Sequence, residues 1–341
     1  MYLSSSGFQI FLLTKSLIHV FILMSEYTVS ILIPVYNSSC YLVRCLQSIL
    51  KQDTARKIQV VIINDCSTDN SGDIIDLYTS TFQSNNIEYK VLQNTSNKGI
   101  AYTRKLLIEH SRGKYVMFID SDDYIDSHAV ESLCNLADET HSDIIVSDFF
   151  EEKKNKQHLR RTPFFNSHKE FLRHVVDAKC NALWNKMFKK SFIDDFCLGE
   201  MFSTGHDFWE DYAFVTKACL NANKVVKIGR PYYHYVMYNN QSVTKQFFDE
   251  KKLDSMVYYL TIISSLVEKC ETTLNPIVIQ KKFKLKEMCI LKCRKENITN
   301  YRTIFPELAN HGYYIRNHII SSELFIKIIR IIYASKKKFN L

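Results

Sequence analysis

The chain has 341 residues, enough for one large domain or two ordinary ones, and its 46% hydrophobic and 23% charged residues are typical of a globular protein. Eight Gly and five Pro exclude a collagen-like or low-complexity protein, and ten scattered Cys without a CxxC motif favour free thiols over a secreted disulfide scaffold. The net charge of +8 is uneven, because the chain from Lys245 onward holds 18 Lys and Arg against 9 Asp and Glu. Such asymmetry suggests an anionic partner.

Residues 1–24 are predicted to be an N-terminal extension. Residues 8–23 are apolar, but Lys15 and His19 interrupt them, and the run is shorter than the roughly 20 residues of a membrane span. It also lacks the basic region and cleavage site of a secretory signal. Met24 stands directly before a clean strand pattern, so we expect the protein to start there. A marginal membrane anchor is the alternative.

Strand and helix patterns alternate from residue 28 to residue 120. Buried, β-branched runs predict strands over 28–36, 58–65, 87–94 and 114–120. Apolar residues at helical spacing, after capping residues, predict helices over 41–52, 67–80 and 97–113, the last ending in a Gly113 C-cap. This alternation predicts an α/β fold with a Rossmann-like, mostly parallel sheet flanked by helices.

The second half of the chain is less regular. We expect a strand over 142–152, a polar basic connection over 153–162, a helix over 206–222 and a strand, turn and strand over 224–238. From about residue 247 the pattern is helical and rich in Lys. Residues 245–341 are therefore predicted to form a basic, helical C-terminal region.

Acidic residues gather where the predicted strands end, which is where ligands bind to sheets of this kind. Asp65 follows the second strand, and Asp120 and Asp122 follow the fourth. Two carboxylates at positions i and i+2 repel each other, and a divalent cation removes that repulsion. Because no soft ligand is nearby, Mg²⁺ or Mn²⁺ fits best. An acidic loop with helix-capping aspartates is the alternative.

Five short segments are specific by their combination, order and spacing: SILIPVYN, VIINDCSTDNS, NKGIAYTR, YVMFIDSDDYI and WEDYAF. Together they resemble the inverting, nucleotide-sugar-dependent glycosyltransferases of family 2, which have the GT-A fold. The resemblance covers residues 28–238 and implies a GT-A domain over residues 25–244. It also implies transfer of a sugar from a UDP-sugar to a glycan or lipid-linked acceptor, here in the synthesis of a bacterial cell-surface polysaccharide.

The resemblance also implies roles for the donor side of the site. The implied nucleotide-binding residues are Pro34, Val35, Tyr36, Asp65, Gly99, Arg104 and Asp120. Asp122 is the implied direct metal ligand, and Asp120 contacts the ribose or the metal. Gly99 permits close approach of the backbone, and Arg suits recognition of a phosphate or base. The alternatives are that Asp65 and Asp69 cap the next helix and that Arg104 lies on a helix surface.

On the acceptor side, the resemblance implies that Asp211 is the catalytic base and that Glu210 supports it. A single carboxylate is enough, because the metal stabilises the diphosphate leaving group. The alternative is that these acids only favour the dipole of the helix they begin. Trp209 is also predicted to contact the acceptor or the sugar, and it stands where the family often has Gly, so the motif does not define the shape of the sugar pocket. Trp184 is predicted to line the acceptor side, with a core position as the alternative.

The C-terminal region interleaves Lys and Arg with Ile, Leu and Phe, as in KKFKLKEMCILKCRK and ELFIKIIRIIYASKKKF. Such basic amphipathic helices predict peripheral contact with an anionic membrane, here the inner face of the cytoplasmic membrane. Packed helices with solvated lysines are the alternative. No recognised motif supports nucleic acid as the partner.

Two other functions stay open at this stage. The first is a nucleotidyltransferase-like enzyme of sugar nucleotides, which usually has a loop rich in Gly, Arg and Lys after the first strand. The loop VYNSSCYLVR has no glycine. The second is a non-catalytic protein that binds a nucleotide-sugar. Loss of Asp211 or of the DxD pair would be its signature, and both are present.

Overall fold

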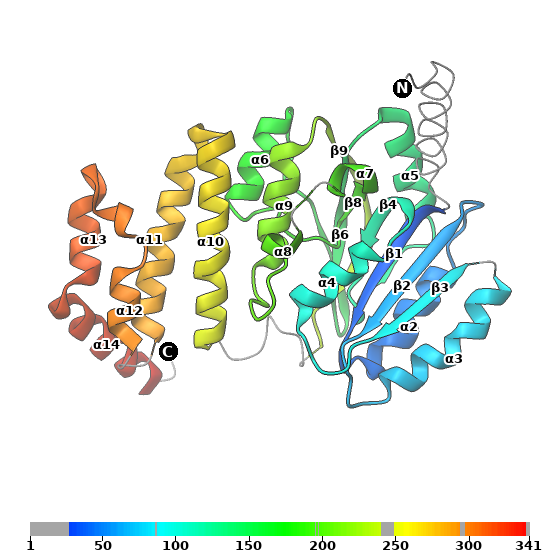
Figure 1. The fold of residues 1–341 in the computed structure, drawn as a ribbon, viewed down its shortest axis with the longest axis horizontal. Coiled ribbons are helices and arrows are strands. Elements are labelled where there is room, and N and C mark those ends of the chain that lie inside the picture. The colour runs from blue at the N-terminus through cyan, green and yellow to red at the C-terminus, as the bar shows by residue number, and fades with distance from the viewer. Residues whose placement is uncertain are drawn as a thin grey trace, which may run out of the picture.

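The computed structural model describes residues 27–85, 87–194, 196, 198–239, 249–293 and 297–338. The expected extension over 1–24 and the expected boundary between residues 244 and 245 lie outside these residues. Figure 1 shows a sheet with helices on both faces and, at one end, a group of C-terminal helices that extends away from it. The predicted α/β class with a helical C-terminal extension is confirmed.

The first half of the chain folds as its pattern predicts. Its strands are β1 (Tyr27–Val35), β2 (Ile58–Asn64), β3 (Glu88–Gln93) and β4 (Gly113–Phe118). Its helices are α2 (Ser39–Leu50), α3 (Ser71–Ser84) and α4 (Ile100–Glu109). β1 and β2 bury nearly every residue, because helices cover both faces of the sheet at these strands.

Gly113 does not cap α4, which corrects the prediction. The helix ends at Glu109 with His110 as its C-cap, and Gly113 is the first residue of β4. A Cβ at Gly113 would lie 2.4 Å from the backbone nitrogen of Ser30. Glycine is therefore needed for the close approach of β4 to β1.

The strands form one sheet in the order β3-β2-β1-β4-β8-β6-β9-β5, and β7 pairs with β6. The remaining strands are β5 (Tyr124–Ile125), β6 (Ile144–Lys153), β7 (Lys156–Arg160), β8 (Lys186–Lys189) and β9 (Val225–Val236). β3, β2, β1 and β4 run parallel, as do β6 and β9. The pairings of β4 with β8, β8 with β6, β6 with β7 and β9 with β5 are antiparallel. The sheet is thus parallel from β3 to β4 and mixed beyond β4.

Two segments of the second half differ from expectation. The basic connection over 153–162 contains β7, which forms a hairpin with β6, and its five residues are all exposed. The segment over 224–238 is the single strand β9 and not two strands around a turn. Its pairing with β6 shifts register between Ser147 and Phe149, so Gly229 and Arg230 form an irregularity within a continuous strand.

Helices cover both faces of the sheet. On one face, α2, α3 and α5 (Ala129–Thr140) pack against the side chains of Ile31, Ile33 and Val60. On the other face, α4 packs on β1 and β2, α9 (Glu210–Asn221) contacts β4 and β8 through Phe214, and α6 (His168–Val176) packs on α9. The short helices α7 (Lys190–Ile193) and α8 (Leu198–Met201) lie beside β8 and α9.

The C-terminal helices continue the second of these cores. α10 (Glu250–Cys270) packs on α9, and α11 (Asn275–Lys292) packs on α10. Beyond them lie α12 (Ile298–Thr303), α13 (Tyr314–Ser321) and α14 (Glu323–Lys338). The 3₁₀ turns of this region are η1 (Thr272–Leu274), η3 (Pro306–Ala309) and η4 (His311–Tyr313). Within the described part of the chain, no helix is both long and apolar enough to cross a membrane.

Candidate active site

The carboxyl ends of β1, β2 and β4 meet at one edge of the sheet and bring the predicted donor-side residues together. At the end of β1, Pro34 and Val35 are buried, whereas the side chain of Tyr36 is 47% exposed. The carbonyl of Val35 accepts a hydrogen bond from the backbone nitrogen of Asp65 (2.8 Å). Of the three predicted residues on this strand, Tyr36 is the one that presents its side chain to solvent.

The side chain of Asp65 is buried and orders the loop before α4. Its carboxylate accepts hydrogen bonds from the side-chain amide of Asn94 (2.7 Å) and from the backbone nitrogens of Lys98 (2.8 Å) and Gly99 (2.9 Å). Asp65 does not cap α3, whereas Asp69 accepts from the backbone nitrogen of Ser71 at the start of that helix (3.0 Å), so the capping alternative is wrong for Asp65 and correct for Asp69. Its predicted contact with the nucleobase stays a prediction.

Asp69, and not a serine of the loop before α2, holds the start of α2. Its carboxylate accepts from the backbone nitrogens of Ser39 at the start of α2 (2.9 Å) and Ser71 at the start of α3 (3.0 Å). Ser38, the N-cap residue of α2, instead directs its hydroxyl to the Tyr36 carbonyl and to Ser121. One acid thereby fixes the first turns of two neighbouring helices.

Gly99 and Asp207 meet at the start of α4. Gly99 has a φ of 88°, and a Cβ there would lie 2.2 Å from a carboxylate oxygen of Asp207. That carboxylate accepts a hydrogen bond from the backbone nitrogen of Ala101 (3.1 Å). The sequence pattern missed Asp207, because nothing local marks an acid before α9 as the cap of α4.

Replacing Gly99 by alanine is expected to disrupt this helix start. The new methyl group would collide with the Asp207 carboxylate, and the positive φ disfavours any L side chain. We expect the free energy of unfolding to fall by about 1–3 kcal/mol, measured by urea denaturation, together with weaker nucleotide binding. Gly229→Ala is the matched control, because a Cβ there meets nothing within 4 Å. Equal effects of the two substitutions would contradict the role of this contact.

The three acids after β4 have different environments. Asp123 is fully buried, and its carboxylate accepts from the hydroxyl of Tyr233 (2.7 Å) and the backbone nitrogen of Val236 (2.7 Å). It therefore ties the acidic loop to β9 and does not face the site. The Tyr233 hydroxyl also accepts from the backbone nitrogen of Asp120 (3.1 Å). Asp120 and Asp122 are the acids that remain partly exposed.

Asp122 lies between Asn239 and Arg44. Its carboxylate accepts from the side-chain amide of Asn239 (2.7 Å), and its backbone carbonyl accepts from a guanidinium nitrogen of Arg44 (3.1 Å). The Arg44 guanidinium also stacks over the ring of Tyr124, 4.6 Å from its centroid. Burial and the neighbouring Asp120 raise the pKa of the Asp122 carboxyl. The two acids therefore repel each other as the sequence suggested.

This pair of acids suits a divalent cation whose remaining ligands come from elsewhere. Each carboxylate has about four lone-pair positions, and among the residues that the structure describes Asn239 donates to Asp122 and Arg104 donates to Asp120. No group of three or more His, Cys, Asp or Glu that fits a metal occurs in the described part of the chain. Asp120 and Asp122 thus match the pattern of Mg²⁺ sites that one or two carboxylates and substrate phosphates complete.

Arg104 joins the acids that follow β4 to the acids that begin α9. Its guanidinium donates to Asp120 Oδ1 (2.9 Å) and to Glu210 Oε1, and its side chain is 8% exposed. Burial lowers its pKa, but the carboxylates of Asp120, Glu210 and Asp211 raise it by more, so Arg104 stays charged. The alternative of a surface arginine is wrong. Its predicted contact with the nucleotide stays a prediction.

Glu210 and Asp211 begin α9, as the sequence indicated. Burial raises the pKa of both carboxyls, and the positive charge of Arg104 opposes this rise. Asp211 Oδ1 accepts from the backbone nitrogen of Tyr212 (2.7 Å). Because Glu210 is paired with Arg104, Asp211 is the acid of this pair that fits proton transfer better.

The two tryptophans lie in different surroundings. Trp209, the N-cap residue of α9, has a φ of 80°, a conformation that favours glycine, and its ring packs edge-on against Tyr212. Trp184 stacks on Tyr233 (centroids 4.6 Å apart) and Tyr235 (5.3 Å) of β9. It is partly buried, and the stacked Tyr233 contacts both Asp120 and Asp123. The sequence pattern gave no signal for Tyr233, which arrives from a distant strand.

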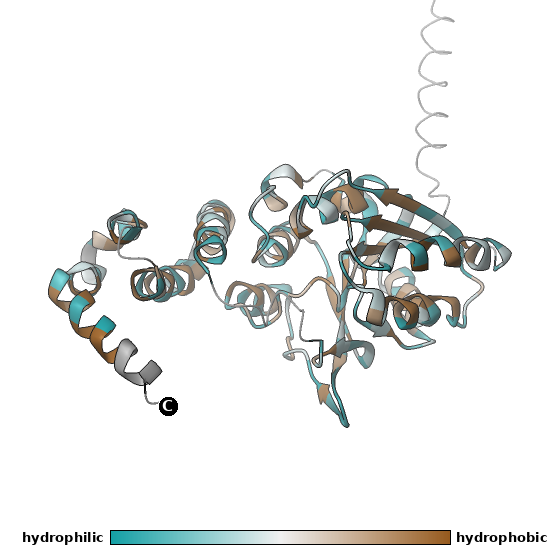
Figure 2. Cartoon of the chain, turned by 90° about the horizontal axis from the view of Figure 1, so that it is seen from below, coloured by the Kyte–Doolittle hydropathy of each residue, from teal (hydrophilic) through white to brown (hydrophobic). Residues whose placement is uncertain are grey.

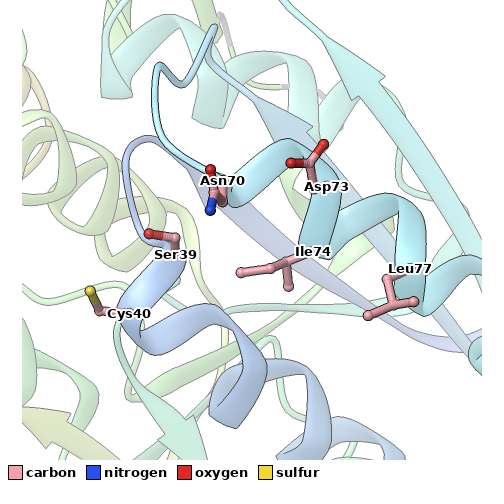
Figure 3. Close-up of a pocket in the computed structure, with 6 residues that line it drawn as sticks. All are labelled: Ser39, Cys40, Asn70, Asp73, Ile74 and Leu77. Carbon is pink, nitrogen blue, oxygen red and sulfur yellow. The ribbon is translucent and has the colours of Figure 1, made fainter.

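A separate surface hollow of about 410 Å³ lies between the starts of α2 and α3 (Figure 3). Its lining residues are Ser39, Cys40, Asn70, Asp73, Ile74 and Leu77. None of these residues belongs to the predicted site. The hollow therefore lies outside the candidate active site, although both adjoin the loops that follow β1 and β2.

Comparison with known proteins agrees with this architecture. A family model described as glycosyl transferase family 2 matches residues 30–205, about half of the chain. The chain belongs to this family.

Two bacterial relatives of the chain are named as glycosyltransferases. EpsH of Bacillus subtilis, named as a glycosyltransferase, is 30% identical over 237 residues, which cover 67% of this chain and 66% of EpsH. TarS of Staphylococcus aureus, a poly(ribitol-phosphate) beta-N-acetylglucosaminyltransferase, is 28% identical over 214 residues, covering 60% of this chain and 35% of TarS. The chain therefore spans less than two thirds of the length of either relative.

A solved structure confirms the predicted fold. The crystal structure of TarS residues 1–349 in complex with UDP-GlcNAc superposes with a TM-score of 0.68 at 20% identity, covering 91% of this chain and 92% of that one. The likeness extends beyond the sheet and shows that the chain has the GT-A fold.

Proposed function

We propose that the protein is a metal-dependent, inverting glycosyltransferase that moves a sugar from a UDP-sugar to a saccharide or lipid-linked saccharide. One observation carries the proposal: Arg104 pairs with Asp120 on the donor side and with Glu210 beside the candidate base. One buried arginine thus holds the acids that would bind the sugar donor close to the carboxylate that would act as the base. This arrangement suits a direct displacement at the anomeric carbon. TarS, which shares the fold, was solved with UDP-GlcNAc, and this supports UDP as the nucleotide.

In this mechanism, Asp211 accepts the proton of the acceptor hydroxyl as its oxygen attacks the anomeric carbon of the donor. The bond from that carbon to the diphosphate oxygen breaks, and the electron pair leaves with UDP. Attack opposite to the leaving group inverts the anomeric configuration. A Mg²⁺ or Mn²⁺ ion held by Asp122 and Asp120 would neutralise charge on the diphosphate. Arg104 keeps Glu210 paired and holds the first turn of α9 in place.

The biological setting is part of the same proposal. The relatives include poly(ribitol-phosphate) glycosyltransferases of bacteria, which supports a role in the synthesis of a cell-surface polysaccharide. UDP-sugars are cytoplasmic donors, so we place the reaction in the cytoplasm, at the inner face of the membrane where a lipid-linked acceptor is available.

Titration of UDP into the purified protein tests the donor site. We expect UDP to bind more tightly with Mn²⁺ present, and Asp122→Ala to weaken this binding at least about 10–100-fold. Asp126→Ala is the matched control, because Asp126 belongs to the same acidic segment but accepts from the backbone nitrogen of His128 (3.1 Å) beside α5. Release of UDP from candidate UDP-sugars with glycan acceptors is then measured to identify the donor.

Three outcomes would contradict parts of the proposal. Tight binding of UDP without metal would contradict the predicted role of Asp122 as a metal ligand. Binding of GDP instead of UDP would overturn the donor assignment. Binding of UDP-sugars without turnover on any acceptor would support a non-catalytic binding protein.

A further inference from the structure

The two last helices expose apolar side chains at the end of the molecule that is farthest from β3 (Figure 1). On α13, Ile315 is 70% exposed and Ile319 is 49% exposed. On α14, Leu324 is 69% exposed, and Ile328 and Ile332 are each 47% exposed. We call these five residues the C-terminal apolar face. Figure 2 shows apolar positions recurring along the helix that leads to the C-terminus.

The larger part of this face lies on α14, and the opposite side of α14 packs against the rest of the protein. Ile326 is buried, and Arg330 donates to the carbonyls of Ile290 (3.0 Å) and Cys293 (3.0 Å) at the end of α11. Leu324, Ile328 and Ile332 stand four residues apart, so they form one stripe along α14. The stripe is therefore an outward surface of a packed helix, and exposed apolar surface of this kind marks an interaction site.

The charge around this face indicates the kind of partner. Together α13 and α14 contain six Lys and Arg against one Glu, and three of the lysines, Lys336–Lys338, form the last turn of α14. Arg316 and Lys327 are exposed beside the apolar residues. A second copy of this chain would bring like charges together, whereas anionic lipid headgroups would neutralise them.

We propose that the C-terminal apolar face docks on an anionic lipid surface, with α14 lying in the headgroup region. The apolar side chains enter the boundary of the acyl chains, and the basic side chains contact the headgroups, as in other interfacial amphipathic helices. In Figure 1, α14 and the loops after β1 and β2 lie toward the same lower side of the molecule.

The test is sedimentation of the full chain with vesicles, read without donor or acceptor, so that its failure is distinct from failure of the proposed transfer. We expect binding to vesicles of phosphatidylcholine and phosphatidylglycerol, and little to phosphatidylcholine alone. Replacing Leu324, Ile328 and Ile332 together by serine should weaken partitioning about tenfold or more. Replacing Lys336, Lys337 and Lys338 by glutamine should weaken it in low salt by a similar factor.

Matched controls keep the test decisive. Leu77→Ser removes an equally exposed leucine from α3 (73% exposed) and should leave vesicle binding unchanged. UDP binding and the urea midpoint show that each variant is folded. Equal binding of wild type and the triple serine variant would overturn the proposal. So would a wild-type dimer in light scattering that becomes monomeric in the triple serine variant, because a second copy would then cover the face.

Discussion

Asp211→Asn is expected to lower kcat by about 10²–10⁴-fold, the usual contribution of a general base. The amide has nearly the same shape as the carboxylate, and its oxygen still accepts the hydrogen bond from Tyr212. The variant should therefore bind UDP as the wild type does. Turnover and UDP affinity are measured side by side. Asp194→Asn, which changes a half-exposed aspartate paired with Lys190, is the control and should retain full activity.

The pH dependence of kcat/KM is a second test of the role of Asp211. Because burial raises the pKa of Asp211, its carboxylate takes up a proton at a higher pH than an exposed aspartate does. The base is lost as pH falls through that raised pKa, so the acid limb of kcat/KM should lie above the value of about 3.9 for a free aspartate. Near wild-type activity of Asp211→Asn, or an acid limb at the ordinary value, would assign the base to another group.

Arg104→Gln is expected to cause the largest loss of stability. The substitution leaves the Glu210 carboxylate, whose side chain is 6% exposed, without its cationic partner. Breaking a buried ion pair in this way costs about 3–5 kcal/mol. Chemical denaturation in urea measures the free energy of unfolding. Lys105→Gln is the matched control, since its half-exposed pair with Glu109 (3.7 Å) should contribute less than about 1 kcal/mol.

A double-mutant cycle separates the pair from the individual residues. Arg104→Gln combined with Glu210→Gln should cost less than the sum of the single substitutions, because no unpaired charge is then buried. If Arg104→Gln unfolds at the wild-type urea concentration but binds UDP poorly, Arg104 acts as a nucleotide ligand and its ion pairs are not structural.

The first half of the fold, from β1 to β4, was predictable because its signals are local. Each of β1, β2 and β4 is rich in apolar residues, and the spacing of Leu42 and Leu46 marks the buried side of α2. The mixed half was harder because its strands are short or polar. β8 has four residues, and every residue of β7 is exposed, so neither shows an alternating pattern.

The acids of the candidate site were predictable, but their partners were not. Asp120, Asp122, Glu210 and Asp211 stand in short motifs that a resemblance brings out. The hydrogen bonds and ion pairs of these acids come from residues that are distant in the sequence. Tyr233 reaches Asp123 across 110 positions, and Arg104 reaches Glu210 across 106. Local sequence patterns do not predict such pairings, because the pairings depend on which strands and helices become neighbours in the folded sheet.

The carboxylate of Asp69 has a mechanical consequence. Because it accepts hydrogen bonds from the starts of both α2 and α3, one carboxylate links the loops after β1 and β2 to each other. Tyr36 and Asp65 are the first residues of these two loops, and the backbone nitrogen of Asp65 also donates to the carbonyl of Val35 (2.8 Å), so the spacing of the two residues is constrained without a ligand. A rigid edge of this kind loses little entropy on association, and a greater share of its contact energy remains as affinity.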